Sequence, residues 1–549
     1  MVAEYVRKVL SIPAVLAIGV AVVLGLSACG SSSSSGGKGG TLEATYSSFP
    51  DYLDPALSHS PEAWTAIYNT YIPLLTYAHA GGEAGSQVIP GLARAMPKVS
   101  DGGRRYALTL RRGLRYSDGS PVRASDFAFA VERMFRLNSS GSPFYTDIVG
   151  AEAFAKTKKG GIPGIRTDDA SGEIGIELAK PRGTFTNELA LPFVAPVPSD
   201  TPVEDLTAHP PSATGPYEIT RSQPGRGWEY ERNPQWRANN AKLLPELPGG
   251  HMDKIRVTVI RNSSTQVNDI EQGTFDWMGN SPPADRYAAV KDRYEGTQFR
   301  VEPTVSNYFF WMNTSTAPFD DVRVRQAVNY AIDPEALERI YAGQLVGLQQ
   351  VLPPGMPGYG RFELYPHDME KAKRLIAEVK PADRSITVWT DSESPNNEAG
   401  EYLEDVLSKL GFEAKLKIVN ADSYIGVIGN DSTPDLDIGF AAWFQDYPHP
   451  NDFFQPLLDE ASLTPTNTTN LARFADPAIS ATIERLGEKQ LDSQVEGEYA
   501  ALDREVMEQA PWAPYGASTF PTFVSSAVDL EKVIFNPTFS QDLTSFQFK

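Results

Sequence analysis

The sequence predicts a mixed α/β protein that contains a partly parallel sheet and folds around more than one core. Its 549 residues exceed the size of roughly 250–300 residues at which a single core stops growing. Residues 386–419 read as a strand, a helix and a strand with short joints, and such a unit sets its two strands parallel. Hydrophobic residues are 41% and charged residues 21% of the chain, a balance that argues against wholesale disorder.

The N-terminus reads as a targeting segment. Arg7 and Lys8 precede an apolar run from Val9 to Gly25, and Leu26-Ser27-Ala28-Cys29 follows. These four residues resemble the bacterial lipobox, in which the bond before the cysteine is cut and its thiol is diacylated. An uncleaved membrane anchor is the alternative. We expect residues 1–28 to be a lipoprotein signal peptide, Cys29 to be the lipid attachment site, and residues 29–40 to be a flexible Gly/Ser linker.

In the first half of the chain, Tyr106 to Leu110 alternates apolar and polar residues, as a half-buried strand does. Ser125 is the expected N-cap of a helix that runs to about Leu137. Alternation returns from Ile174 to Leu178 after the turn residues 168–172, which predicts a second strand.

In the second half, three aspartates are expected to cap helices, because an Asp side chain accepts hydrogen bonds from free backbone N–H groups. They are Asp321, Asp333 and Asp368. The predicted strand–helix–strand unit follows, as strand Ile386–Trp389, helix Glu398–Leu410 and strand Ala414–Val419.

Several function classes are disfavoured by composition and motif. The formal charge of −20 disfavours nucleic-acid binding, because an acidic surface repels phosphates. A single cysteine excludes an intrachain disulfide, and the six histidines show no metal-ligand spacing. The sequence has no nucleophile elbow, phosphate-binding loop or dinucleotide-binding glycine motif. We therefore expect no catalytic residue, metal or cofactor, although a catalytic triad need not be local in sequence.

One motif is a candidate ligand site. Trp443-Phe444-Gln445-Asp446-Tyr447 follows residues 436–442, which read as a buried strand. An acidic residue just beyond a buried strand can meet a ligand at the sheet end, and Asp446 is suited to a ligand cation with Trp443 packed on it. The alternative is a surface turn whose aromatic residues fill the core.

Several segments together resemble the extracellular solute-binding proteins of family 5, the dipeptide- and oligopeptide-binding lipoproteins of ABC importers. The matching segments follow the family order along nearly the whole chain after the linker. They are Leu53-Asp54-Pro55, Gly91 to Phe127, Thr214-Gly215-Pro216-Tyr217, Asn307 to Asn313, Phe319 to Asp333, and Trp443 to Pro450. Tyr116-Ser117-Asp118 departs from the Phe-His-Asp usual in the family.

The resemblance implies a fold and a domain layout. The fold is a two-lobed, periplasmic-binding-protein-like clamp of type II with an extra inserted subdomain, and two strands that cross between the lobes form the hinge. Lobe I is expected to take residues 41–60, 185–300 and 520–549. The inserted subdomain is expected at 61–184, and lobe II at 301–519.

The resemblance also implies residue roles. Asp446 pairs with the α-ammonium of a bound peptide, and the strand residues Ala442 to Phe444 bond its backbone. The lobe I side is expected at Ser58, His59 and Ser60, by their offset from Asp54-Pro55. The complete predicted ligand set is Asp446, Trp443, Tyr447, Ala442, Phe444, Ser58, His59 and Ser60.

The function implied is peptide capture by a lipid-anchored, monomeric receptor on the outer face of the bacterial cytoplasmic membrane. Clamp closure would deliver di- to oligopeptides to an ABC permease that a cytoplasmic ATPase drives. One alternative keeps the clamp but binds a nickel chelate, an oligosaccharide or an amine, since the aromatic residues around Asp446 would also suit a sugar or a flat ligand. A remote alternative is a secreted hydrolase or a surface chaperone.

Overall fold

The computed structural model of the protein describes residues 39–549. The predicted signal peptide at 1–28, the lipid attachment site Cys29 and residues 29–38 of the predicted linker lie outside the described residues. Among the described residues, no helix combines the length and the apolar character needed to span a bilayer.

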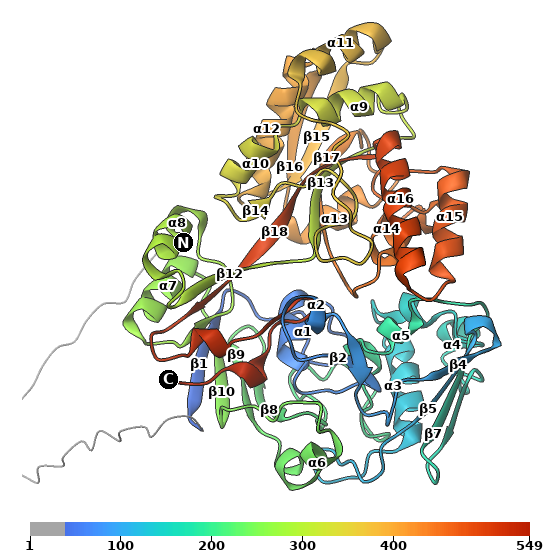
Figure 1. Ribbon diagram of the computed structural model, residues 1–549, viewed down its shortest axis with the longest axis vertical. Coiled ribbons are helices and arrows are strands. Elements are labelled where there is room, and N and C mark those ends of the chain that lie inside the picture. The colour runs from blue at the N-terminus through green and yellow to red at the C-terminus, as the bar shows by residue number, and fades with distance from the viewer. Residues whose placement is uncertain (1–38) are drawn as a thin grey trace, which may run out of the picture. The chain divides into compact units, whose positions relative to one another are not determined.

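A twelve-stranded mixed sheet runs through the described part of the chain in the order β16-β15-β17-β13-β18-β11-β1-β10-β9-β8, and β12 and β14 pair with β18 (Figure 1). Its strands are β1 (Thr41–Tyr46), β8 (Tyr217–Gln223), β9 (Gly227–Arg232), β10 (Lys254–Val259), β11 (Trp277–Met278), β12 (Phe299–Pro303), β13 (Ser306–Met312), β14 (Leu345–Val346), β15 (Ser385–Asp391), β16 (Glu413–Val419), β17 (Ile438–Phe444) and β18 (Trp512–Val524).

The long strand β18 connects the two parts of this sheet. Residues Trp512 to Gly516 pair with β13, whereas residues Thr519 to Val524 pair with β12 and β11. The β12–β13 segment makes the same passage beside it. Two neighbouring stretches of chain therefore join one part of the sheet to the other, and both border the site described below.

The buried apolar residues form two large clusters, one on either part of the sheet. The first contains residues of β1, β8, β9 and β10 together with most buried apolar residues between 53 and 247. The second contains only residues between 305 and 515. A smaller cluster links β12 to α7 (Ser263–Gln272) and α8 (Ala284–Tyr294). The division of the core matches the expectation that a chain of this length cannot bury its apolar residues in one cluster.

A four-stranded antiparallel sheet stands apart from the large one, in the order β4-β5-β7-β6. Its strands are β4 (Lys98–Ser100), β5 (Arg105–Thr109), β6 (Ile165–Asp168) and β7 (Glu173–Glu177), and two small hairpins are β2 (Leu75–Tyr77) with β3 (Val88–Pro90) and β19 (Phe535–Asn536) with β20 (Ser540–Gln541). The strands β5 and β7 confirm the alternation read around residues 106–110 and 174–178.

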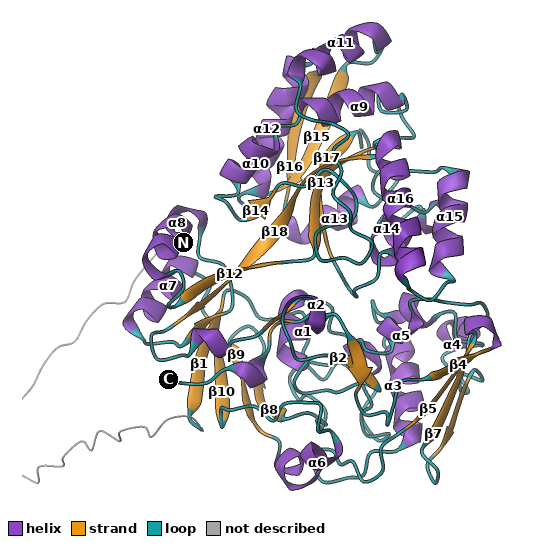
Figure 2. Cartoon of the chain, viewed as in Figure 1, coloured by secondary structure: helices purple, strands orange, loops and turns teal. Residues whose placement is uncertain are grey.

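The helices between residues 322 and 509 lie around the second cluster and its strands β13, β15, β16 and β17 (Figure 2). The helices other than α7 and α8 are α1 (Pro61–Ile67), α2 (Gly82–Gly85), α3 (Ala124–Arg136), α4 (Ala151–Thr157), α5 (Phe185–Glu188), α6 (Ala241–Leu243), α9 (Val322–Ala331), α10 (Pro334–Ile340), α11 (Met369–Val379), α12 (Asn396–Lys409), α13 (Ala421–Ile428), α14 (Asn451–Leu458), α15 (Pro477–Gly487) and α16 (Ser493–Gln509).

The predicted strand–helix–strand unit is confirmed as β15, α12 and β16, with β15 parallel to β16 along its whole length. The predicted caps Asp321, Asp333 and Asp368 each accept a backbone N–H in the first turn of their helix. The predicted cap of α3 is wrong by two residues. Arg123 occupies the N-cap position, and the Oγ of Ser125 instead bonds Asp169, 2.9 Å away.

Candidate functional site

A cavity of about 700 Å³ lies where segments far apart in the sequence meet. Its wall includes the end of β17, the β12–β13 joint, the middle of β18 and the start of α1. Five of the predicted ligand residues line it: His59, Ala442, Trp443, Phe444 and Asp446. The structure therefore brings one residue of the Asp54 region next to the motif near residue 446, as the sequence predicts.

Asp446 and His59 face each other in the cavity wall. The Nε2 of His59 lies 3.3 Å from Oδ1 of Asp446, and the two side chains are 36% and 14% exposed. Burial acts to lower the pKa of His59, but the hydrogen bond and charge of Asp446, together with the charge of Asp51, outweigh it and raise the pKa. The carboxylate of Asp446 thus already has a hydrogen-bonding partner that can carry a positive charge, and a ligand ammonium could take its place.

A second carboxyl group lies behind Asp446. The Oδ2 of Asp452, at the start of α14, accepts the backbone N–H of Asp446 at 2.9 Å. Burial, and next the negative charge of Asp446, raise the pKa of Asp452 well above its usual range. The raised pKa favours the protonated form of Asp452, in which it holds the Asp446 backbone without adding a like charge beside its carboxylate.

The strand that leads to Asp446 has a free edge. β17 pairs with β13 from Ile438 to Phe444, but on its other side β15 pairs with Ile438 and Gly439 alone. Within residues 39–549, no strand pairs with the β15-facing edge of residues 441–444. Because Ala442, Trp443 and Phe444 line the cavity, an extended ligand can add a strand there.

Three predicted ligand residues do not line the cavity. The hydroxyl of Ser58 is buried and donates to the carbonyl of Asp54 at 2.7 Å, while Ser60 caps helix α1. Tyr447 is buried in the first apolar cluster, with its ring edge against Phe144. These three side chains are therefore not among those that line the cavity, and their predicted contact with a ligand stays a prediction.

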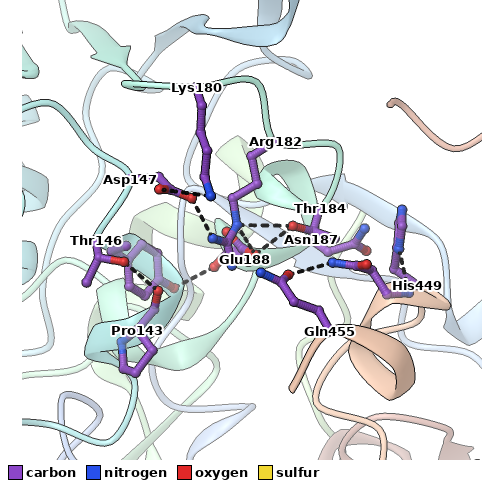
Figure 3. Close-up of polar contacts among 12 residues, drawn as sticks. Pro143, Thr146, Asp147, Lys180, Arg182, Thr184, Asn187, Glu188, His449 and Gln455 are labelled. Atoms are coloured by element: carbon purple, nitrogen blue, oxygen red, sulfur yellow. Dashed lines mark hydrogen bonds and ion pairs between the residues drawn. The ribbon is translucent and has the colours of Figure 1, made fainter. Parts of the chain in front are cut away.

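Arg182 is the centre of a largely buried charged network (Figure 3), whose charges also act on Tyr447. Nε of Arg182 donates to Glu188 at 2.7 Å, and Nη1 donates to Asp147 at 2.8 Å. Although burial acts to lower the pKa of Arg182, the charges of Glu188 and other acidic neighbours raise it. The carboxylates of this network keep the guanidinium charged and fixed in place.

His449 lies near the same network and is neutral. Burial, with help from the positive charge of Arg182, lowers its pKa to about 3. Its Nδ1 accepts the N–H of Asn451 at 3.1 Å, and Asn451 in turn donates to Gln455 at 2.7 Å (Figure 3). A histidine with this pKa serves as a hydrogen-bond acceptor in the α14 start and does not titrate near neutral pH.

Other residues of the cavity were missed from the sequence. Glu62 and Trp64 of α1 line it, as does Glu393, which follows β15. Gln445 was inside the predicted motif but had no assigned role; its Nε2 donates to the carbonyl of Pro537 at 3.0 Å, across the cavity wall. Glu62, Trp64 and Glu393 lie outside the motif, the first two far from it in the sequence, and none of the three carried a local signal. In the described part of the chain, no group of three His, Cys, Asp or Glu side chains is placed to hold a metal ion.

Comparisons with known proteins agree with this geometry. The model of the bacterial extracellular solute-binding proteins, family 5 (middle region), matches residues 87–464. The probable di/tripeptide-binding protein 5 of Pseudomonas aeruginosa (strain UCBPP-PA14) is 25% identical over 84% of this chain and 87% of that protein. Heme-binding protein A of Haemophilus influenzae (strain ATCC 51907 / DSM 11121 / KW20 / Rd) is 24% identical over 91% and 92%.

A solved structure is also similar over nearly the whole chain. The clavulanic acid biosynthesis oligopeptide binding protein 2 is 26% identical and superimposes with a TM-score of 0.85, covering 93% of this chain and 96% of that one. This likeness confirms the predicted two-lobed type II fold. The chain belongs to the bacterial extracellular solute-binding proteins of family 5.

Proposed function

We propose that this protein captures extracytoplasmic peptides in the cavity around Asp446 and passes them to the permease of an ABC importer. The observation that carries the proposal is the position of the Asp446 carboxylate, in the cavity wall two residues beyond the free edge of β17. A free edge offers backbone hydrogen bonds to any extended peptide, and a carboxylate at its end offers a partner for the peptide ammonium.

Ligand binding would replace one cation by another. The peptide ammonium takes the place of the His59 imidazole at Asp446, while the peptide backbone bonds residues 442–444. Closure follows if the ligand contacts both walls only in the closed form. Moving a two-state protein from 1% to 99% closed requires about 5.5 kcal/mol of preference, which a charge-assisted bond and several backbone bonds together can supply.

The remaining parts of the proposal rest on the sequence. The lipobox-like Leu26-Ser27-Ala28-Cys29 supports a lipid anchor at Cys29 on the outer face of the cytoplasmic membrane. The receptor is proposed to act as a monomer, with a membrane permease and a cytoplasmic ATPase as partners and without catalysis of its own.

The proposal is tested by binding of matched peptides to an Asp446→Ala variant. For a free-amine peptide we expect a loss of at least roughly 30-fold in affinity, about 2 kcal/mol, because one partner of a close charge pair is removed. The N-acetylated form of the same peptide lacks the ammonium and should bind the parent protein and the variant alike. Asp292→Ala, an exposed change on α8, is the matched control.

Equal losses for the free and the acetylated peptide would contradict the role of Asp446. Native mass spectrometry of the protein without residues 1–28 tests the ligand class directly. A distribution of peptide masses, removed by unfolding and refolding, supports peptide capture; a single non-peptide mass, such as that of a sugar or a chelate, would overturn it.

A further inference from the structure

The charges that line the cavity are almost all of one sign. Three carboxylates face it: Glu62 from α1, Glu393 after β15, and Asp446 after β17. Among the described residues that line the cavity, none is a lysine or an arginine, and His59 is the one residue able to carry a positive charge. A bound peptide therefore finds a partner for its ammonium but, among the described lining residues, no lysine or arginine for its terminal carboxylate.

The two additional carboxylates hold no cation of the protein. Within residues 39–549, neither Glu62 nor Glu393 forms an ion pair, whereas Asp446 already pairs with His59. Burial raises the pKa of Glu62, and the negative charge of Asp51 adds to the effect. A positive ligand group beside Glu62 relieves this electrostatic cost, while a negative one increases it.

A buried amide in the same wall also lacks a donor. Gln445 is 6% exposed, and its Nε2 is occupied by Pro537. Its Oε1 is buried and has no hydrogen-bond partner among the described residues, although Gln445 lines the cavity. A buried acceptor left unpaired is costly, so this oxygen calls for an N–H donor on the ligand.

Glu393 lies beside the path that a peptide would take if it paired with the free edge of β17. β15 runs parallel to β17 with Trp389 opposite Gly439, and it ends at Asp391, just where the free edge of β17 begins. Glu393 follows on that same side of β17. A peptide whose ammonium lies at Asp446 and whose backbone follows the free edge is thus led past Glu393.

We propose that the ligands are cationic peptides, with a guanidinium or ammonium side chain held by Glu62 or Glu393, and that the peptide carboxylate is not recognised by charge. This inference rests on the proposed peptide capture and names the class of peptide. Guanidinium groups fit best because they carry several N–H donors and stack on aromatic rings, and Trp64, Tyr308 and Trp443 line the same cavity.

The first experiment measures affinity for free-amine tetrapeptides at one ionic strength, by titration calorimetry. The set is tetraalanine and its variants with arginine or glutamate at position two or three. We expect an arginine peptide to bind roughly tenfold more tightly than its glutamate counterpart at one position at least. Equal affinities at both positions would overturn the inference but leave peptide capture standing. Binding of no peptide would overturn both.

The second experiment compares tetraalanine with its C-terminal amide. Because no lysine or arginine of residues 39–549 lines the cavity, the amide should bind as tightly as the acid or more tightly. A loss of roughly tenfold or more on amidation would reveal a charged partner for the carboxylate and would contradict the proposal.

The third experiment changes the protein. Glu62→Gln and Glu393→Gln keep the shape of the side chain and remove its charge, so at least one of them should shrink the arginine-to-glutamate affinity ratio severalfold. Glu531→Gln, at an exposed position outside the cavity, should leave the ratio unchanged. An unaltered ratio in both cavity variants would overturn the assignment of these two residues.

Discussion

Two acid–base pairs join distant parts of this chain, and they are built differently. Asp54 and Arg133 are fully buried and bond through both oxygens, at 2.7 and 2.5 Å. The Nε of Arg133 also donates to a backbone carbonyl, that of Pro202, at 2.8 Å. His59 and Asp446 share one contact of 3.3 Å, in a cavity wall where both side chains keep some solvent exposure.

The difference indicates that one pair stabilises the fold and the other is available to a ligand. A buried pair with its remaining hydrogen bonds satisfied cannot be opened without leaving an unpaired charge in the core. A single long contact at a cavity wall is weak and lies within reach of a ligand. Asp54 belongs to the family-like Leu53-Asp54-Pro55 and therefore has a structural role. The contact of Asp446 is the one that suits an exchange of His59 for a ligand group.

The largest expected effect comes from breaking the buried pair. Arg133→Met should lower the free energy of unfolding by about 3–5 kcal/mol, because it leaves the carboxylate of Asp54 buried without its partner. Urea or thermal unfolding measures the change. Arg104→Met, which removes the exposed pair with Asp101, is the control and should change stability by less than about 1 kcal/mol. Similar losses of unfolding free energy in the two variants would contradict the difference that we expect between buried and exposed pairs.

A smaller effect is expected where the 182–184 segment meets the end of α15. The N–H of Gly183 donates to the carbonyl of Gly487 at 2.8 Å, and a Cβ at Gly183 would lie 1.7 Å from the carbonyl oxygen of Lys489. Gly183→Ala should force the two segments apart, and we expect the contact between them to lose about 1–3 kcal/mol of stability.

If this junction closes around the ligand, that cost appears as weaker peptide binding, with little change in the melting temperature of the ligand-free protein. Gly175→Ala, in β7 of the same region with open space at its Cβ, is the matched control. A lower melting temperature of the ligand-free Gly183→Ala protein, at unchanged peptide affinity, would instead show that this junction is formed without ligand, as the Asp54–Arg133 pair is.

The smallest effect concerns the pH dependence of binding. Asp446 raises the pKa of His59 against the opposing effect of burial, so the pair is at full strength below the ordinary histidine pKa of 6.5. Its contribution to stability is lost as the pH rises through the raised pKa. A charged His59 competes with the peptide ammonium, so affinity for free-amine peptides should rise severalfold at most between about pH 5 and about 7, where most of the amine stays charged.

His59→Gln removes this competitor and should flatten the pH profile, which titrations at several pH values would measure. An N-acetylated peptide should show little pH dependence with either protein. An equally steep profile in the variant would assign the titration to another group and remove His59 from the exchange.

The local elements of the fold were predictable because their signals lie within a few residues. Asp321, Asp333 and Asp368 cap their helices through side-chain bonds to backbone two or three residues on. The wrong cap at Ser125 has a tertiary cause, since Asp169 binds both the hydroxyl and the backbone N–H of Ser125.

The site was predictable only in part. The motif around Asp446 lines the cavity because an acidic residue directly after a buried strand lies at the end of the sheet. The facing segment was placed by offset, and of its three residues His59 alone lines the cavity. Hydrogen bonds such as the one from Ser58 to the carbonyl of Asp54 decide which of the neighbouring side chains faces the cavity.

By itself, the sequence determined the acidic balance, the strand–helix–strand unit, the helix starts at Asp321, Asp333 and Asp368, and the family, since all of these are properties of composition or of short segments. Only the tertiary structure decided which of the 69 acidic residues share one cavity. Glu62, Glu393 and Asp446 meet there because the chain passes between the two parts of the sheet through β12–β13 and β18. Long-range strand pairing brings them together, and no local pattern of residues encodes it.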